Sequence, residues 1–163
     1  MKTRKSWNEK LTDGKDLPKV GKIMGKMTSR WGTGTMVIPA PIEVDAIMKK
    51  VPRGKLITIN EIRSRLAQKH NADIACPITT GIFAWIAAHA AEEAAAAEKT
   101  KITPYWRTLK TGGLLNEKYP GGIGQLKKQL EAEGHKIIQK GKRYLVSDFE
   151  KSLVTRSRSP KRV

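Results

Sequence analysis

The residues best suited to chemistry lie in the stretch Pro104-Tyr105-Trp106-Arg107, with Tyr119 and Glu133 further along the chain. The rings of Tyr105, Trp106 and Tyr119 can form an aromatic wall on which a planar ligand such as a nucleobase stacks. A phenol has a pKa near ~10, so it is mostly protonated at neutral pH and is a poor nucleophile. An indole cannot relay a proton. These residue types therefore favour ligand binding over covalent catalysis.

The other reactive groups indicate no metal site and no cofactor. Cys76 is the sole thiol and comes just before a predicted helix, where a buried structural thiol is expected. The three histidines, His70, His89 and His135, have no metal-ligand spacing. The pattern Gly121-Gly122-x-Gly124 at the start of a helix can hold a phosphate, but no Gly-Lys-Ser/Thr follows it.

The charge of the chain predicts a polyanionic partner. Its 163 residues include 32 Lys or Arg against 15 Asp or Glu, which gives a net charge of +17. Such an excess creates a strong positive field that favours nucleic acid, and an RNA- or ribosome-associated module fits it as well as a DNA-binding protein. The single cysteine favours a reducing compartment, and the sequence has neither a secretory signal nor an apolar run of ~18 residues. We expect a cytoplasmic, nucleoid-associated protein without membrane contact.

The chain divides into three parts. Residues 1–40 are a basic N-terminal extension without a sustained period, whose Trp and Met side chains favour partial docking on the body. Residues 41–154 form the folded domain, and residues 155–163 are a basic tail that is expected to be disordered. Within the domain, the patterns predict helices over 42–51, 58–70, 77–98 and 123–133, a hairpin of 136–139 with 143–146, and a last short helix that Asp148 caps.

The second predicted helix has the clearest start signal. Thr58 with Glu61 three residues on is a capping box. The basic residues expected on the outward face of this helix are Arg63, Arg65 and Lys69. Three short helices followed by a glycine-rich stretch and a hairpin favour a winged helix-turn-helix, in which the second helix braces a duplex and the third enters a groove.

Four pieces of sequence, in the right order, resemble the DNA-binding domain of the O6-alkylguanine-DNA alkyltransferases. Residues 51–58 (Val-Pro-Arg-Gly-Lys-Leu-Ile-Thr) are similar to the Pro-x-Gly-x-Val-x-Thr-Tyr stretch that opens that domain. Pro104 and Arg107 match the ends of its Pro-Cys-His-Arg loop. The last two pieces are Tyr119-Pro120-Gly121-Gly122 with Lys127, similar to its Gly-Tyr-x-Gly-Gly-x-x-x-Lys segment, and Glu133-Gly134, similar to its closing Glu-Gly. The resemblance covers about residues 42–135.

The chain departs from this family at the residues that carry the family's chemistry. The position of the alkyl-accepting Cys is Tyr105 and that of the adjacent His is Trp106, whereas the family's Glu is kept as Glu133. The Tyr that helps to rotate the target nucleotide is Ile59, and the arginine finger of the recognition helix falls near Ile78. The chain is thus most similar to the cysteine-less alkyltransferase-like branch, whose members bind alkylated guanine and pass the lesion to excision repair.

The resemblance implies a mainly α fold with a small β component, a winged helix-turn-helix of the alkyltransferase C-terminal domain type. The implied function is non-enzymatic binding of double-stranded DNA, with O6-alkylguanine sensed by base flipping and an excision-repair protein as partner. The expected lesion pocket consists of Pro104, Tyr105, Trp106, Arg107, Tyr119 and Glu133. The expected DNA contacts are Lys55, Thr58, Arg63, Arg65, Lys69, Thr79, Thr80 and Lys110.

Two further alternatives stay open at this point. The aromatic side chains can simply fill the vacated pocket, which leaves a DNA-binding fold without lesion recognition. An enzyme that uses Cys76 as its nucleophile is the other alternative, although a buried thiol is inert in that role.

Overall fold

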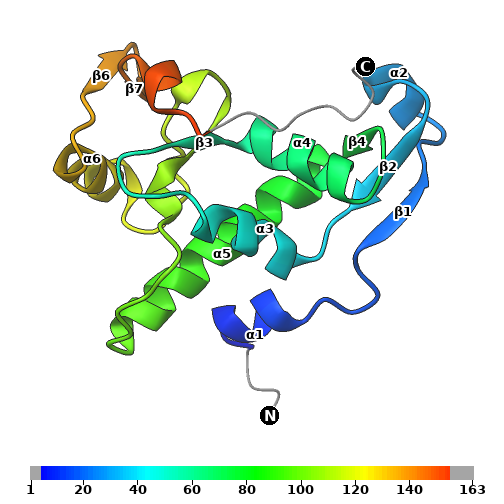
Figure 1. The fold of residues 1–163 in the computed structure, drawn as a ribbon, viewed down its shortest axis with the longest axis horizontal. Helices are drawn as coiled ribbons and strands as arrows, with labels where there is room; N and C mark the ends of the chain where they lie inside the picture. The colour runs from blue at the N-terminus through cyan, green and yellow to red at the C-terminus, as the bar shows by residue number, and fades with distance from the viewer. Residues whose placement is uncertain (1–4, 155–163) are drawn as a thin grey trace.

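The computed structural model describes residues 5–154 and is mainly helical, as the sequence predicts (Figure 1). The helices are α1 (Trp7–Thr12), α2 (Met27–Trp31), α3 (Pro41–Lys49), α4 (Ile59–Lys69), α5 (Pro77–Ala96) and α6 (Gly122–Ala132). The strands are β1 (Lys19–Lys22), β2 (Thr35–Ile38), β3 (Ile57–Thr58), β4 (Ile74–Ala75), β5 (Thr108–Leu109), β6 (Ile137–Lys140) and β7 (Arg143–Val146). The 3-10 turns are η1 (Tyr105–Arg107), η2 (Thr111–Gly113) and η3 (Phe149–Ser152).

Helix α5 is the centre of the core because its alanines let other helices approach closely. Ala84, Ala87, Ala88 and Ala91 recur at helical spacing and are buried. Helices α1 and α3 pack against α5, and α4 also contacts it. The helix continues without a break into its alanine-rich half, which the high helix propensity of alanine supports.

The start of α4 is set by its cap and by a short parallel strand pair. The Thr58 side chain accepts a hydrogen bond from the backbone N–H of Glu61 at 3.3 Å, which confirms the N-cap half of the predicted capping box. Strand β3 pairs in parallel with β5, with Ile57 opposite Thr108. Because the two strands are parallel, η1 lies beside the loop that precedes β3, and Lys110 lies beside the start of α4.

The N-terminal extension is more regular than its sequence suggests. Strands β1 and β2 pair antiparallel, and β2 pairs in parallel with β4, which lies in the turn between α4 and α5. Helix α1 docks on α5, where the Glu93 carboxylate accepts hydrogen bonds from the backbone N–H groups of Trp7 and Asn8 at 2.9 and 3.1 Å. A short segment with no sustained period becomes ordered here because its partners come from distant parts of the chain.

The C-terminal part of the domain forms the predicted hairpin and a different last turn. Strands β6 and β7 pair antiparallel from Ile137 opposite Val146 to Lys140 opposite Arg143, and they form the wing. Asp148 does not cap a helix as predicted: its φ is 53° and its side chain makes no cap hydrogen bond, so only the 3-10 turn η3 follows. The predicted disordered tail, 155–163, lies outside the described residues, as do residues 1–4.

Candidate nucleic-acid interface

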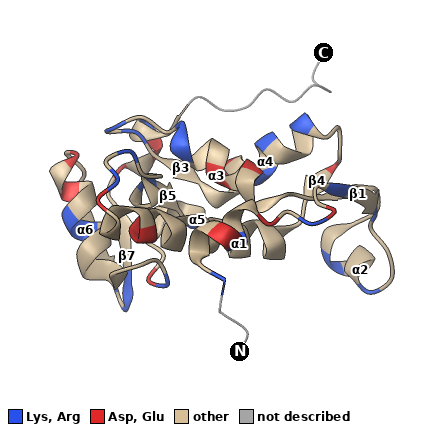
Figure 2. Cartoon of the chain, turned by 90° about the horizontal axis from the view of Figure 1, so that it is seen from below, with Lys and Arg blue, Asp and Glu red and all other residues tan. Residues whose placement is uncertain are grey.

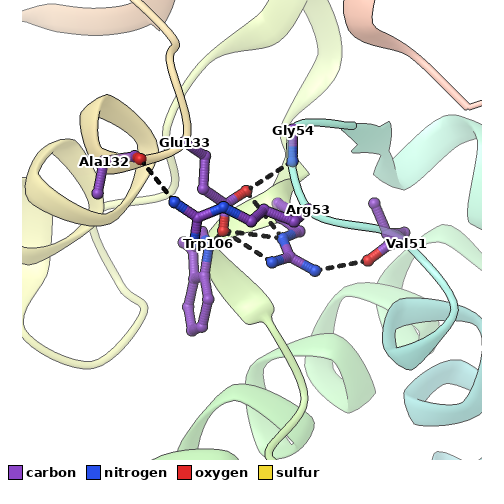
Figure 3. Close-up of polar contacts among 7 residues, drawn as sticks. Val51, Arg53, Gly54, Trp106, Ala132 and Glu133 are labelled. Carbon is purple, nitrogen blue, oxygen red and sulfur yellow. Dashed lines mark hydrogen bonds and ion pairs between the residues drawn. The ribbon is translucent and has the colours of Figure 1, made fainter.

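Glu133 is the centre of a buried polar cluster that joins three segments of the chain (Figure 3). Its carboxylate accepts from Trp106 Nε1 at 2.7 Å, from Arg107 Nε and Nη2 at 2.8–3.0 Å, and from the backbone N–H of Gly54 at 3.1 Å. Arg107 also donates through Nη1 to the carbonyl of Val51 at 2.7 Å. The loop between α3 and β3, the turn η1 and the end of α6 are therefore held together by one carboxylate.

The electrostatics of this cluster keep Glu133 ionised. Burial by itself raises the pKa of Glu133, but the hydrogen bonds from Arg107, Trp106 and Gly54 outweigh it and hold the pKa below its ordinary value of 4.5. The Glu133 side chain is 3% exposed and that of Arg107 is 13% exposed. Both charges are already satisfied by each other, so this pair positions the loop and has little capacity left for a ligand.

Tyr105 and Tyr119 are packed into the core. They are 1% and 4% exposed and meet edge to face with ring centroids 6.0 Å apart. The Tyr105 hydroxyl donates to Glu92 Oε2 on α5 at 3.2 Å. Burial and the nearby Glu92 carboxylate raise the pKa of the Tyr105 phenol far above 10. The phenol therefore stays protonated, and its hydroxyl is committed to Glu92.

Three other residues of the expected lesion pocket line a cleft of their own. Pro104, Trp106 and Arg107 line a cleft of 620 Å³ together with Ile102 and two lysines, Lys49 and Lys101. The structure thus brings Trp106, Arg107 and Glu133 together through hydrogen bonds and packs Tyr105 against Tyr119. The six residues expected around a lesion do not surround one common cavity among those found in residues 5–154.

The basic residues of α4, expected to face outward, are engaged within the protein. Arg63 is half-buried and donates through Nε to the carbonyl of Ala75 at 3.1 Å. Arg65 pairs with Glu61 at 2.8 Å, one turn away. Lys69 pairs at 2.7 Å with Glu43, a nearly buried carboxylate on α3. Because these partners lie on the protein itself, the charges that α4 presents to a ligand are smaller than its sequence suggests.

Two lysines expected at DNA, Lys55 and Lys110, are exposed and have no ion pair within the described part of the chain. Lys110 lies at the rim of a cleft of 840 Å³ between the start of α4, the 110–117 loop and the wing. Its walls include Ile59, Leu114, Ile123 and Tyr144, and its other cations are Lys142 and Arg143. An apolar wall beside three cations suits a base and its phosphate, although Glu117 also lines the cleft. This cleft could not be predicted from the sequence, because its walls meet only in the folded chain.

The start of α5 presents apolar side chains where polar ones were expected. Thr80 is fully buried and donates its hydroxyl to the carbonyl of Cys76 at 2.6 Å, so it does not lie on the surface as expected. Thr79 is partly buried, and its hydroxyl oxygen is inaccessible and has no hydrogen-bond partner among residues 5–154. Ile78 and Ile82 are 56% and 46% exposed. Their spacing of four residues places them on one face of the helix, and that spacing is the sequence signal that could have identified this face.

Comparison with known proteins finds this fold in two solved structures. No protein-family model matches the chain, and no curated protein matches it by sequence. The chain is similar to S. pombe Atl1 in complex with damaged DNA containing O6-carboxymethylguanine, and to S. pombe ATL in complex with DNA. Each is 20% identical to this chain, and the TM-scores are 0.52 and 0.51. The matched region spans 71% of this chain and 94% of each of the two solved chains. The chain has the alkyltransferase-like fold.

Within the alkyltransferase-like fold of this chain, the described residues offer no metal site and no membrane span. No group of three or more His, Cys, Asp or Glu in residues 5–154 could hold a metal ion. Over the same residues, no helix is long and apolar enough to cross a bilayer. Cys76 is a free thiol, buried at the start of α5.

Gly81 is a mid-helix glycine that no neighbouring side chain requires. It lies between Ile78 and Ile82 in the chain and is partly exposed, and a Cβ placed there would meet no atom within 4 Å. A mid-helix glycine costs about 1 kcal/mol relative to alanine, and no packing contact in the described structure explains that cost. Close approach of a ligand to the helix backbone is one use of such a glycine.

We expect Gly81→Ala to change stability and binding in opposite directions. The substitution should raise the free energy of unfolding by about 1 kcal/mol, because it removes the helix penalty of glycine. It should weaken DNA binding, because the added methyl group separates the helix backbone from the duplex. Denaturant unfolding and a fluorescence-anisotropy titration with a DNA duplex measure the two effects. A more stable variant with unchanged DNA affinity would show that the glycine has no such role.

Proposed function

We propose that this protein binds double-stranded DNA through the first half of α5 and the adjoining loop and wing, without transferring an alkyl group. The observation that carries the proposal is the exposed face of Ile78, Gly81 and Ile82 on a helix of an alkyltransferase-like fold. Apolar side chains that enter the minor groove can wedge between base steps. The net charge of +17 supplies the attraction to phosphate.

The state of three side chains supports binding without group transfer. Tyr105, which the resemblance assigns to the alkyl-accepting position, is buried and protonated. The neighbouring indole of Trp106 is committed to Glu133. The one thiol, Cys76, is buried on the opposite side of the helix start from the exposed isoleucines, among Ile23 and Met36. None of these three side chains is placed as an activated nucleophile.

The finer part of the proposal is that an O6-alkylguanine lesion is sensed as an extrahelical base. Because Tyr105 and Tyr119 fill the core, the space that suits such a base is the 840 Å³ cleft lined by Ile59, Leu114 and Ile123. The cations at its rim can hold the adjoining phosphates. A lesion held in this way would mark the site for an excision-repair protein.

A paired binding titration tests the proposal. The two probes are DNA duplexes of identical sequence, with and without one O6-methylguanine, and a structured RNA of equal length is the third. We expect both duplexes to bind, the damaged one more tightly, and no methyl group to appear on the protein by mass spectrometry. Equal affinity for the two duplexes would remove lesion sensing and leave DNA binding. Preference for the RNA at physiological salt would replace DNA with RNA as the ligand.

A further inference from the structure

The N-terminal extension carries a cluster of positive charge that the α5 face does not account for. Residues 17–42 contain four basic residues and no acidic one. Of these, Lys22, Lys26 and Arg30 are exposed and form no ion pair within residues 5–154. Figure 2 shows Lys and Arg on β1 and α2, at the end of the molecule opposite α6.

This charge cluster is attached rigidly to the helix-turn-helix. Strand β2 pairs with β4, and only Cys76 lies between the end of β4 and the start of α5. The backbone N–H of Cys76 donates to the carbonyl of Val37 at 2.9 Å. Ile23, Met36 and Cys76 form a small buried core between the extension and the start of α5. The cluster therefore keeps a defined place beside the recognition helix instead of moving as a free arm.

The tip of the extension also exposes apolar side chains next to its charges. Met24 is 69% exposed and Met27 is 39% exposed, with Lys22 and Lys26 beside them in the chain. Methionine is one of the residues that proteins insert into the minor groove, and lysines beside it suit the flanking phosphates. Both features match a duplex, because its phosphates complement the charge and its groove accepts the apolar tip.

We propose that the extension, residues 19–31, is a second DNA-contacting surface that binds the duplex beyond the segment covered by α5. This inference rests on the proposed DNA binding and deepens it, because it assigns named cations to the flanking DNA. Lys22, Lys26 and Arg30 contact phosphates without regard to base sequence or damage. The extension raises the affinity for every duplex that is long enough to reach it and leaves the lesion preference unchanged.

The test compares two triple variants with equal loss of charge. The first, K22Q/K26Q/R30Q, changes the extension. The control, K99Q/K127Q/K128Q, changes three exposed lysines just beyond the end of α5 and on α6, away from the extension and the wing. Each protein is titrated with undamaged duplexes of about 10 and about 24 base pairs, which are roughly one and more than two helical turns, at several salt concentrations. Thermal unfolding checks that all three proteins are folded.

We expect the extension variant to bind the long duplex about 10- to 100-fold more weakly than wild type at 0.1 M salt. Its log–log salt slope should be smaller by about 2.7, since each phosphate contact contributes about 0.9. The affinities of the extension variant and wild type for the short duplex should differ much less. The control variant should bind both duplexes as wild type does. If wild type binds and the extension variant matches it in affinity and slope, this inference is overturned while the proposed function stands. If wild type binds no duplex at all, the proposed function fails and the inference with it.

Discussion

Replacing Ile78 and Ile82 together with aspartate should weaken DNA binding by about 50- to 100-fold at 0.1 M salt. Each added carboxylate opposes the phosphate backbone and cancels about one favourable phosphate contact, which is worth roughly 0.9 in the salt slope. The apolar surface available to the groove is lost as well. Both side chains are exposed, so the core is untouched. An aspartate at position 78 lies in the first turn of α5, where the helix dipole favours a negative charge.

The measurement is a DNA titration with wild type, the double variant and a control that adds one carboxylate elsewhere. Ile42→Asp is a suitable control, because Ile42 is 45% exposed and lies in the first turn of α3. It introduces one carboxylate where the double variant introduces two, so its loss of binding free energy should be well below half of the loss from the double variant. A loss from the double variant that is only twice the loss from Ile42→Asp would show that net charge alone is responsible and that α5 has no special place in the interface.

Replacing Glu133 with alanine should destabilise the protein by about 3–5 kcal/mol. This is the range found when one partner of a buried ion pair is removed and the other charge stays buried. Here the charge left behind is Arg107, and the donors of Trp106 and Gly54 lose their acceptor too. Glu131→Ala on the same helix is the control, because Glu131 is exposed, and it should change the free energy of unfolding by less than about 0.5 kcal/mol. Denaturant unfolding measures both. A loss below about 1 kcal/mol for Glu133→Ala would contradict the assigned role.

The same carboxylate should contribute to the pH dependence of stability. The folded-state pKa of Glu133 lies below its ordinary value of 4.5, so the folded state favours the ionised form. The resulting stabilisation is fully present above the unfolded pKa and is lost as the pH falls through the folded pKa. Glu133→Gln should therefore be less stable than wild type at neutral pH and should lose less stability between about pH 5 and pH 2. Parallel curves for the two proteins over that range would exclude Glu133 as a source of the acid sensitivity.

Local signals in the sequence were sufficient to predict the main helices and the wing. These signals act over only a few residues, so their effect can be predicted without knowing the tertiary structure. They are Thr58 with Glu61, Pro77 as the first residue of α5, and Gly134 after α6. The spaced motifs from 51 to 134 also carried the resemblance to the alkyltransferase fold, which the structural comparison confirms.

The partners of each side chain could be decided only by the tertiary structure. Residues 19–38 form two strands and a helix because β2 pairs with β4, some 38 residues further along the chain. No local sequence period predicts this pairing. Thr80 is buried while Ile78 is exposed, since α5 turns its alanine face to the core and leaves the other side open. Glu133 and Arg107 were recognisable as motif residues, but their mutual pairing emerges only where the end of α6 meets η1.

Position 105 shows what the residue type decides and what the tertiary structure decides. The residue type alone excludes a thiolate, because a phenol with an ordinary pKa near ~10 is a poor nucleophile. Packing between η1 and α5 decides the surroundings of this phenol. It is buried against Tyr119 and Glu92 and does not face a ligand. Residue identity limits what a group can do, whereas the surrounding fold sets its solvation, its partners and its access to a ligand.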